Sequence, residues 1–368
     1  MDTTKLLKQL VRIPSVFPNE LRISQFLAQY LKNIGFTVEL VKTKNKRNNI
    51  VSVFGKAKTY IGFYGHMDTV PRKEQKGVNP YNLTIQGKKA FGLGAEDMKG
   101  GISAILQMGE YAVENNLPVK ILFGVDEEDI SRGAHDLVDS GLLEDIRFLI
   151  SAESGQIQNA RQPYNVCYGR KGRVLFDLLI FGKKAHAAEK EKGINAIEQA
   201  IKILTLIQKI RFEKHNNLGS TTVVVHSIEG LTDSFSVPDK CRVLFSLLTS
   251  PFEKSTTFLE KIRTIAKQNS INIDIHPFKR ETPYAESYEV AKGSFLDILE
   301  NLFERDGVVP IYTASVADEN IFANRLQIPV ISIGPMGGGG HTDNEWVDLH
   351  SLKTIESLYK EIVAMYNH

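Results

Sequence analysis

"YIGFYGH" (Tyr60–His66) is a run of apolar and small residues that ends in a histidine, and it predicts a buried strand. Side chains alternate along a strand, so His66 and Asp68, two residues further on, point to the same face. A single His-x-Asp pair is common by chance and by itself indicates a strand end more readily than a site. Its meaning therefore depends on the rest of the chain.

The segments that follow this strand predict the fold class. Residues 100–116, "GGISAILQMGEYAVENN", carry apolar side chains on one helical face, and "VKILFGVDEE" follows as a second apolar strand. Strands that are apolar throughout and alternate with helices are typical of a mostly parallel sheet covered on both faces. We therefore expect an α/β fold with a mostly parallel, mixed sheet sandwiched by helices.

The pattern changes near Gly172 and predicts a second domain. "RVLFDLLIFGKKAHAA" is followed by a helix over 195–210, two strands, a helix over 253–268 and the strand "INIDIHPF", and the α/β pattern resumes beyond Pro283. A chain of 368 residues exceeds what one core usually supports. We expect a discontinuous first domain over 1–171 and 281–368, and an inserted, smaller α+β domain over 172–280.

Composition excludes several classes of protein. A net charge of +2 with dispersed Lys and Arg predicts neither a nucleic-acid nor a membrane partner, and the basic run Lys42–Asn49 is typical of a solvated loop. The N-terminus lacks a secretory pattern, and no apolar stretch is long enough to span a bilayer. Cys167 and Cys241 lie far apart without metal-type spacing, which is typical of a reducing compartment. We expect a cytoplasmic protein.

Acidic and histidine side chains occur where the predicted strands of the first domain end. Besides His66 they are Asp97 in "GLGAEDMKGG", Glu127 and Glu128 in "GVDEED", Glu153 in "SAESG" and His341 in "GPMGGGGHTDNE". Each alone is explained by a helix cap, a solvated turn or a loop charge. Ligands of open α/β sheets collect at the carboxyl ends of the strands, so the joint occurrence favours one shared site.

Two imidazoles and three or four carboxylates are typical ligands of a two-metal hydrolase, and such oxygen and nitrogen donors suit Zn²⁺ or Co²⁺. A shared carboxylate can hold two ions about 3.5 to 4 Å apart. The adjacent acids Glu127 and Glu128 would repel each other if both were free. One bound to metal and one unbound would instead supply a ligand and a general base.

These motifs, with "GHMDTVP", "GKKAHAA" and "GINAI", resemble the co-catalytic zinc hydrolases that include acetylornithine deacetylase, succinyl-diaminopimelate desuccinylase, aminoacylase and glutamate carboxypeptidase. The resemblance covers essentially the whole chain. It implies two Zn²⁺ ions, with Co²⁺ or Mn²⁺ as alternatives, in the first, catalytic domain. It implies that Asp97 bridges the ions, that His66 and Glu153 complete one site, and that Glu128 and His341 complete the other.

The resemblance also implies roles for residues that do not bind metal. Glu127 would be the general base, and Asp68 would orient His66 through its other ring nitrogen. His186 in "GKKAHAA" would stabilise the oxyanion of the tetrahedral intermediate, often from a partner subunit, although the residues alone favour a strand-end turn. The inserted domain would be a lid or dimerisation domain. A cis peptide bond is expected at Asp97–Met98.

The chain departs from the family pattern in the lid. Many members carry an Asp-x-Arg whose arginine binds the substrate carboxylate, whereas this chain has Ser246 and Leu248 at those positions. Losing a planar, bidentate donor is not a neutral change. Either the substrate lacks this carboxylate, or another cation binds it. The candidates are Arg170, Lys171, Arg173 and Arg280.

We therefore expect a metal-dependent hydrolase that cleaves an amide bond of a small N-acyl amino acid or peptide, as a deacylase or an exo- or dipeptidase. The expected partners are a small-molecule or short-peptide substrate and a second copy of the chain, bound through the lid domain. One alternative is a hydrolase that releases an amino acid from a carrier-protein glutamate. Another is a non-catalytic binding protein, which is disfavoured because every expected position, including Glu127, is filled.

Overall fold

The computed structural model describes residues 2–43, 47–71, 79–154, 164–230, 235–342 and 344–368. The chain divides into two compact units. The first comprises Met1–Gly169, Val290–Tyr312 and Ala317–His368, and the second comprises Arg170–Glu289 and Thr313–Val316. The predicted domain boundaries fall at 171/172 and 280/281, and the catalytic and lid roles given to the two domains stay predictions.

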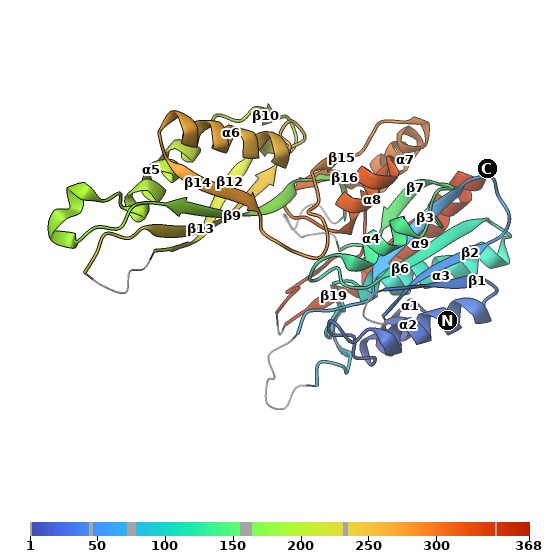
Figure 1. Ribbon diagram of the computed structural model, residues 1–368. Helices are drawn as coiled ribbons and strands as arrows, with labels where there is room; N and C mark the ends of the chain where they lie inside the picture. Colours follow the sequence, from blue (N-terminus) through green and yellow to red (C-terminus); the bar gives the residue numbers. More distant parts are fainter. Residues whose placement is uncertain (1, 44–46, 72–78, 155–163, 231–234, 343) are drawn as a thin grey trace. The chain divides into compact units, whose positions relative to one another are not determined.

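A mixed sheet forms the centre of the first unit, with strand order β1-β2-β6-β3-β7-β17-β8 and with β16 also beside β8 (Figure 1). The strands β3, β6, β7 and β17 run parallel. β1 pairs antiparallel with β2, β2 with β6, and β8 with β17. Their bounds are β1 Thr37–Lys42, β2 Asn48–Phe54, β3 Tyr60–His66, β6 Val119–Gly124, β7 Ile146–Ser151, β8 Tyr164–Arg170, β16 Val308–Thr313 and β17 Val330–Ser332. The predicted α/β fold with a mixed sheet is confirmed, with parallel strands at its centre and antiparallel strands on both sides of them.

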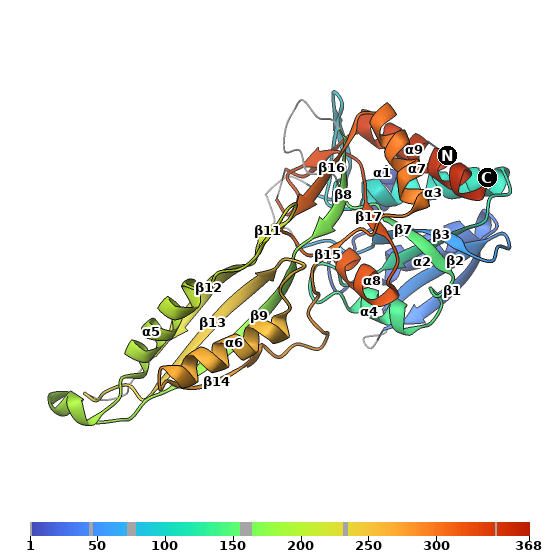
Figure 2. The same cartoon turned by 90° about the horizontal axis from the view of Figure 1, so that it is seen from above.

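Helices cover both faces of this sheet, as β3 shows. Phe63 contacts Tyr359 of α9, while the next residue, Tyr64, contacts Phe322 of α8. Successive strand residues point to opposite faces, so α9 and α8 lie on opposite sides of the sheet (Figure 2). The helices of this unit are α1 Thr3–Val11, α2 Leu21–Asn33, α3 Lys99–Glu114, α4 Arg132–Asp139, α7 Ser294–Arg305, α8 Asp318–Leu326 and α9 Leu349–Asn367. The expected α/β sandwich is therefore present.

A second, small antiparallel sheet in the same unit has the order β18-β19-β5-β4. Its strands are β4 Thr84–Gln86, β5 Lys89–Phe91, β18 Gly337–Gly338 and β19 Trp346–Asp348. Pairing of Phe91 with Trp346 brings the segment before α3 next to the segment before α9. Asp97 and His341 lie in these two segments. Asp97 comes just before α3, as predicted, and neither residue directly follows a strand of the large sheet.

The second unit is an antiparallel sheet with the order β12-β13-β9-β14 and two helices on one face (Figure 1). Phe176 of β9, Phe245 of β13 and Phe258 of α6 pack together in its core. The predicted α+β unit is thus confirmed. Its elements are β9 Gly172–Phe181, η1 Ala187–Lys192, α5 Ala196–Gln208, β10 Lys214–His215, β11 Gly219–Ser220, β12 Thr222–Glu229, β13 Lys240–Thr249, α6 Ser255–Gln268, β14 Asn272–Pro277 and β15 Tyr288–Glu289.

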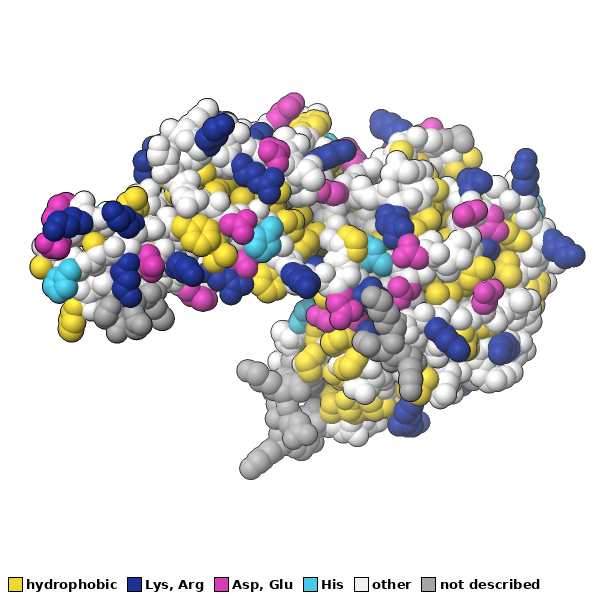
Figure 3. Space-filling model, viewed as in Figure 1, with side chains coloured by type: hydrophobic (Ala, Val, Ile, Leu, Met, Phe, Trp, Pro, Cys, Tyr) yellow, Lys and Arg dark blue, Asp and Glu magenta, His cyan; other side chains and the backbone are white. Residues whose placement is uncertain are grey.

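Charged side chains of both signs are interspersed on the face of the molecule drawn in Figure 3. This distribution agrees with the near balance of 45 Lys and Arg against 43 Asp and Glu. Among the helices of the described residues, none has both the length and the apolar character that crossing a membrane requires.

Candidate metal centre and active site

Three neighbouring parallel strands end at the candidate site. His66 is the last residue of β3, Glu127 and Glu128 follow β6, and Glu153 follows β7. Because β3 lies between β6 and β7 and runs parallel to both, their carboxyl ends meet at one edge of the sheet. His66, Glu127 and Glu153 each offer a potential ligand atom, and these atoms lie within 4.8 Å of one another. The structure thus brings these predicted residues together.

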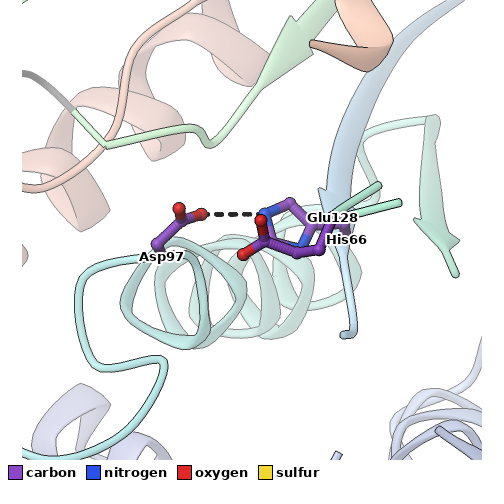
Figure 4. Close-up of side chains that lie close together, drawn as sticks. All are labelled: His66, Asp97 and Glu128. Carbon is purple, nitrogen blue, oxygen red and sulfur yellow. Dashed lines mark hydrogen bonds and ion pairs between the residues drawn. The ribbon is translucent and has the colours of Figure 1, made fainter. Parts of the chain in front are cut away.

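The Asp97 carboxylate lies between the two histidines. Its Oδ1 is 2.8 Å from His66 Nε2, and its Oδ2 is 3.3 Å from His341 Nε2. Glu153 Oε1 lies 3.4 Å from His66 Nε2, and Glu128 Oε2 lies 3.1 Å from His341 Nε2. Figure 4 shows Asp97 directed at the His66 ring, with Glu128 beside it. One carboxylate thus faces two imidazoles, and each imidazole has a further carboxylate of its own.

The backbone around Asp97 contains the expected cis peptide bond, at Asp97–Met98. The loop that bears Asp97 connects β5 to α3, and the Asp97 N–H donates to the Glu345 carboxylate over 3.1 Å. His341 has a left-handed backbone conformation, with φ 62°. Both residues therefore come from irregular segments that the small sheet brings together.

The electrostatics of the cluster favour cations. Burial, with the nearby Asp97 charge, raises the pKa of Glu153 to about 7. Hydrogen bonds to Asp97 and Glu128 raise the pKa of His341 to about 10. Glu128 Oε1 is buried and makes no hydrogen bond to another described residue. Crowded carboxylates that hold imidazoles in the charged form, with a buried oxygen left over, fit a site for divalent cations.

Comparison with known proteins assigns the family. Residues 62–365 match the model of peptidase family M20/M25/M40. The chain belongs to this family. Succinyl-diaminopimelate desuccinylases are similar over nearly the whole length: that of Pelagibacter ubique is 25% identical, covering 98% of both chains. That of Buchnera aphidicola subsp. Baizongia pistaciae is 26% identical, covering 99% of this chain and 98% of its relative.

Solved structures share the fold. The aminopeptidase PepT of Bacillus cereus superposes with a TM-score of 0.80 at 21% identity, covering 98% of this chain and 97% of PepT. A dinuclear metal-binding peptidase of the M20 family from Bacillus subtilis superposes with a TM-score of 0.73 at 16% identity, covering 99% and 97%. As predicted, the chain is a metal-dependent hydrolase of the family that cleaves amide bonds of N-acyl amino acids or peptides.

Asp68 supports this M20 site differently from the prediction. His66 Nδ1 lies 3.1 Å from the backbone carbonyl of Asp68 but 3.6 Å from its carboxylate Oδ1, which is too long for a hydrogen bond. The other carboxylate oxygen accepts the Glu128 N–H over 3.0 Å. The carbonyl is therefore the nearer partner of the imidazole, and the carboxylate holds the backbone of Glu128. A catalytic role for Asp68 stays a prediction.

Arg47 is a supporting residue that the sequence did not indicate. Its Nη1 donates to Glu20 over 3.0 Å and to Asp126 over 2.8 Å, and Arg47 is only 5% exposed. Asp126 has φ 72° and directly precedes Glu127, so this buried ion pair holds the turn that presents the two glutamates. The prediction of a solvated loop over Lys42–Asn49 is wrong for Arg47. Residues 44–46 lie outside the described part of the chain.

His186 lies in the second unit, at the N-cap of η1, where its side chain is exposed. Its Nδ1 accepts the Ala188 N–H over 3.1 Å. A ring nitrogen that accepts carries no proton, so in the neutral ring the proton resides on Nε2. His186 shares a hollow of ≈ 540 Å³ with Lys184, Ala185, Phe235 and Ser236. The backbone therefore orients Nε2–H as a hydrogen-bond donor.

Proposed function

We propose that this M20 enzyme is a deacylase of N-acyl amino acids, with N-succinyl compounds as the first candidates, and that it holds two Zn²⁺ ions. The ligands would be His66, Asp97, Glu128, Glu153 and His341. The main support for two ions is that the two oxygens of the Asp97 carboxylate face different imidazoles. Co²⁺ or Mn²⁺ would suit the same donors. The similarity to desuccinylases supports the acyl group.

In the proposed mechanism the metal ligands, the general base and the oxyanion donor are different side chains. Ions held by these residues would supply Lewis-acid polarisation of the scissile carbonyl and a water of lowered pKa. Glu127, which is not in the ligand set, takes a proton from the attacking water. When the C–N bond breaks, the same carboxyl group gives this proton to the leaving amine nitrogen. Nε2–H of His186 donates to the oxyanion that forms from the carbonyl oxygen.

The function is tested with a panel of N-succinyl, N-acetyl and N-formyl amino acids, dipeptides and tripeptides. The purified protein is assayed after chelation and after reconstitution with Zn²⁺, Co²⁺ or Mn²⁺. We expect metal-dependent release of an amino acid from an acylated substrate. Cleavage of peptides alone would replace the deacylase by an exopeptidase. If no compound of the panel is hydrolysed although two metal ions are bound, this result would instead favour a carrier-linked glutamate as substrate.

Replacing His186 by alanine should lower kcat by about 10²- to 10³-fold, because one donor to the oxyanion is lost. The metal content should not change, since His186 is not in the ligand set. His186→Gln, which keeps a side-chain N–H donor, should lose less activity than His186→Ala. Steady-state kinetics and elemental analysis of both variants measure these effects. Equal loss of kcat in the two variants would contradict the donor role.

We propose further that the chain forms a homodimer through the second unit and acts in the cytoplasm. The edge strand β12 supports the dimer, because Val224, Val225 and Ile228 are all exposed along it. Cys167 and Cys241 are buried thiols that form no disulfide within the described residues, which suits a reducing compartment. If the sites of the dimer are shared, mixing the His186→Ala and Glu127→Ala chains should restore up to about a quarter of the wild-type activity.

The four candidate cations for a substrate carboxylate differ in the hydrogen bonds that their side chains make. Arg170 Nη1 donates to Ser315 over 2.7 Å, Lys171 Nζ donates to the Ser220 carbonyl over 2.6 Å, and Arg280 Nη2 donates to Thr282 over 2.6 Å. Arg173 is exposed, and its guanidinium makes no hydrogen bond or ion pair to another described residue. Arg173 pairs in register with Leu248 across β9 and β13, so the two side chains share one face of the sheet. We therefore propose Arg173 as the donor.

Arg173→Leu should raise KM for substrates with a free carboxylate by about 10- to 100-fold, the range expected for a hydrogen bond to a charged group. kcat should change less. With the carboxylate of the substrate amidated, wild type and variant should show similar KM values. Arg263→Leu, which removes an exposed arginine from α6, is the matched control. An unchanged KM in Arg173→Leu would exclude this residue.

A further inference from the structure

The glycine-rich segment before His341 packs against the side chain of Glu96. A Cβ atom added at Gly337 would lie 2.8 Å from Glu96 Cγ, and one at Gly340 would lie 3.2 Å from Glu96 Oε2. The Gly340 N–H donates to the same oxygen over 2.9 Å. Glycines at these positions therefore let the backbone that leads into His341 approach a buried carboxylate closely.

Glu96 contacts the other ligand-bearing segments as well. It directly precedes Asp97, and its carboxylate interacts electrostatically with the side chain of Ser154, the residue after Glu153. Glu96 is only 7% exposed. One carboxylate thus touches three segments that carry candidate ligands, Asp97, Glu153 and His341, although Glu96 itself is not in the ligand set.

Glu345 makes the reciprocal contact. It lies four residues after His341, and its carboxylate accepts the N–H groups of Gly94 over 2.8 Å, Glu96 over 2.9 Å and Asp97 over 3.1 Å. Its exposed fraction is 4%. A glutamate from each of the two irregular segments, the one before α3 and the one before α9, therefore accepts hydrogen bonds from the backbone of the other segment. Carboxylates bound to several backbone N–H groups fix loops strongly.

We propose that Glu96 is a positioning residue that holds His341 in ligating geometry relative to Asp97. It would thereby set the affinity for the ion bound by His341 and Glu128. This inference rests on the two-metal centre proposed above. His341 depends on such support because its side chain is 56% exposed and its Nε2 contacts the carboxylates of Asp97 and Glu128, which are themselves candidate ligands. A purely structural role would instead weaken the fold without distinguishing the two ions.

The test is a stepwise titration of the metal-free full chain with Co²⁺. Visible absorption measures the amount of Co²⁺ bound, so the result does not depend on activity. Wild type should take up two ions. Glu96→Ala should bind one ion nearly normally and the other about 10- to 100-fold more weakly, the range found for groups that support metal ligands. Glu96→Gln keeps an oxygen that accepts the Gly340 N–H, so it should restore the second affinity to within about threefold of wild type.

Two further variants complete the design. Glu96→Leu has a side chain of similar volume but no hydrogen-bond acceptor. Like Glu96→Ala it is a loss variant, one that removes the carboxylate, and it replaces Glu96→Ala if that protein does not fold. Glu253→Ala removes a buried carboxylate of the second unit that pairs with Lys261, and it should lower stability without changing either Co²⁺ affinity. Thermal unfolding of the metal-free proteins measures the stability part separately.

Each outcome has one interpretation. Selective weakening of one ion in the loss variants, with rescue by glutamine, supports the positioning role. Wild-type affinities for both ions in the loss variants, or equal weakening of both, would overturn it. If wild-type protein itself takes up fewer than two ions, the two-metal centre fails, and this result is recognised before any variant is compared.

Discussion

The Glu127→Ala variant is expected to lose about 10²- to 10⁴-fold in kcat while it keeps both metal ions. The reason is that Glu127 is assigned as general base, and such groups contribute rate accelerations of this size. The test distinguishes a base from a metal ligand, because the Glu127 carboxylate lies within 4.8 Å of potential ligand atoms of His66 and Glu153 and could by position be either. Kinetics on the preferred substrate, with elemental analysis of the same sample, measure both quantities.

Two variants control for this result. Glu127→Gln keeps the shape of the side chain but cannot accept a proton, so it should be nearly as inactive as Glu127→Ala. Glu128→Ala removes a proposed ligand from the adjacent position, so it should lose metal as well as activity. Metal loss in Glu127→Ala parallel to that in Glu128→Ala would show that Glu127 is a ligand, and the assignment of the base would be wrong.

Replacing Asp97 by alanine should have the largest effect on metal content. Its two carboxylate oxygens face different histidines, so a single substitution removes a ligand from both ions. We expect loss of both ions on dialysis and no measurable turnover. Asp97→Asn keeps one strong oxygen donor and should retain at most one ion. Asp97→Ala protein that still holds two ions by elemental analysis would remove the bridge from this account.

The sequence indicated for a clear physical reason that the strand-end residues lie close together. Apolar runs such as Tyr60–His66 mark buried parallel strands, and the carboxyl ends of such strands meet at one edge. His66, Glu128 and Glu153 could therefore be grouped from the sequence alone. The C-terminal helix α9, with Leu352, Ile355 and Tyr359 at helical spacing, was readable in the same way but was not predicted.

The loop part of the site could not be read from a local pattern. β18 has two residues, both glycine, and β19 has three, which is too short for alternation of side chains to be recognised. The contacts of Arg47 with Glu20 and Asp126 depend on tertiary packing between residues 27 and 79 positions apart. The same holds for Glu96 and Glu345, whose partners lie across the small sheet.

Anomalous diffraction at the zinc absorption edge, from crystals of the full chain grown with Zn²⁺, tests the proposed centre most directly. We predict two peaks about 3.5 to 4 Å apart with Asp97 between them. One peak should lie beside His66 and Glu153, and the other beside His341 and Glu128. A single peak, or a pair of peaks that Asp97 does not bridge, would contradict the two-metal centre on which the proposed mechanism depends.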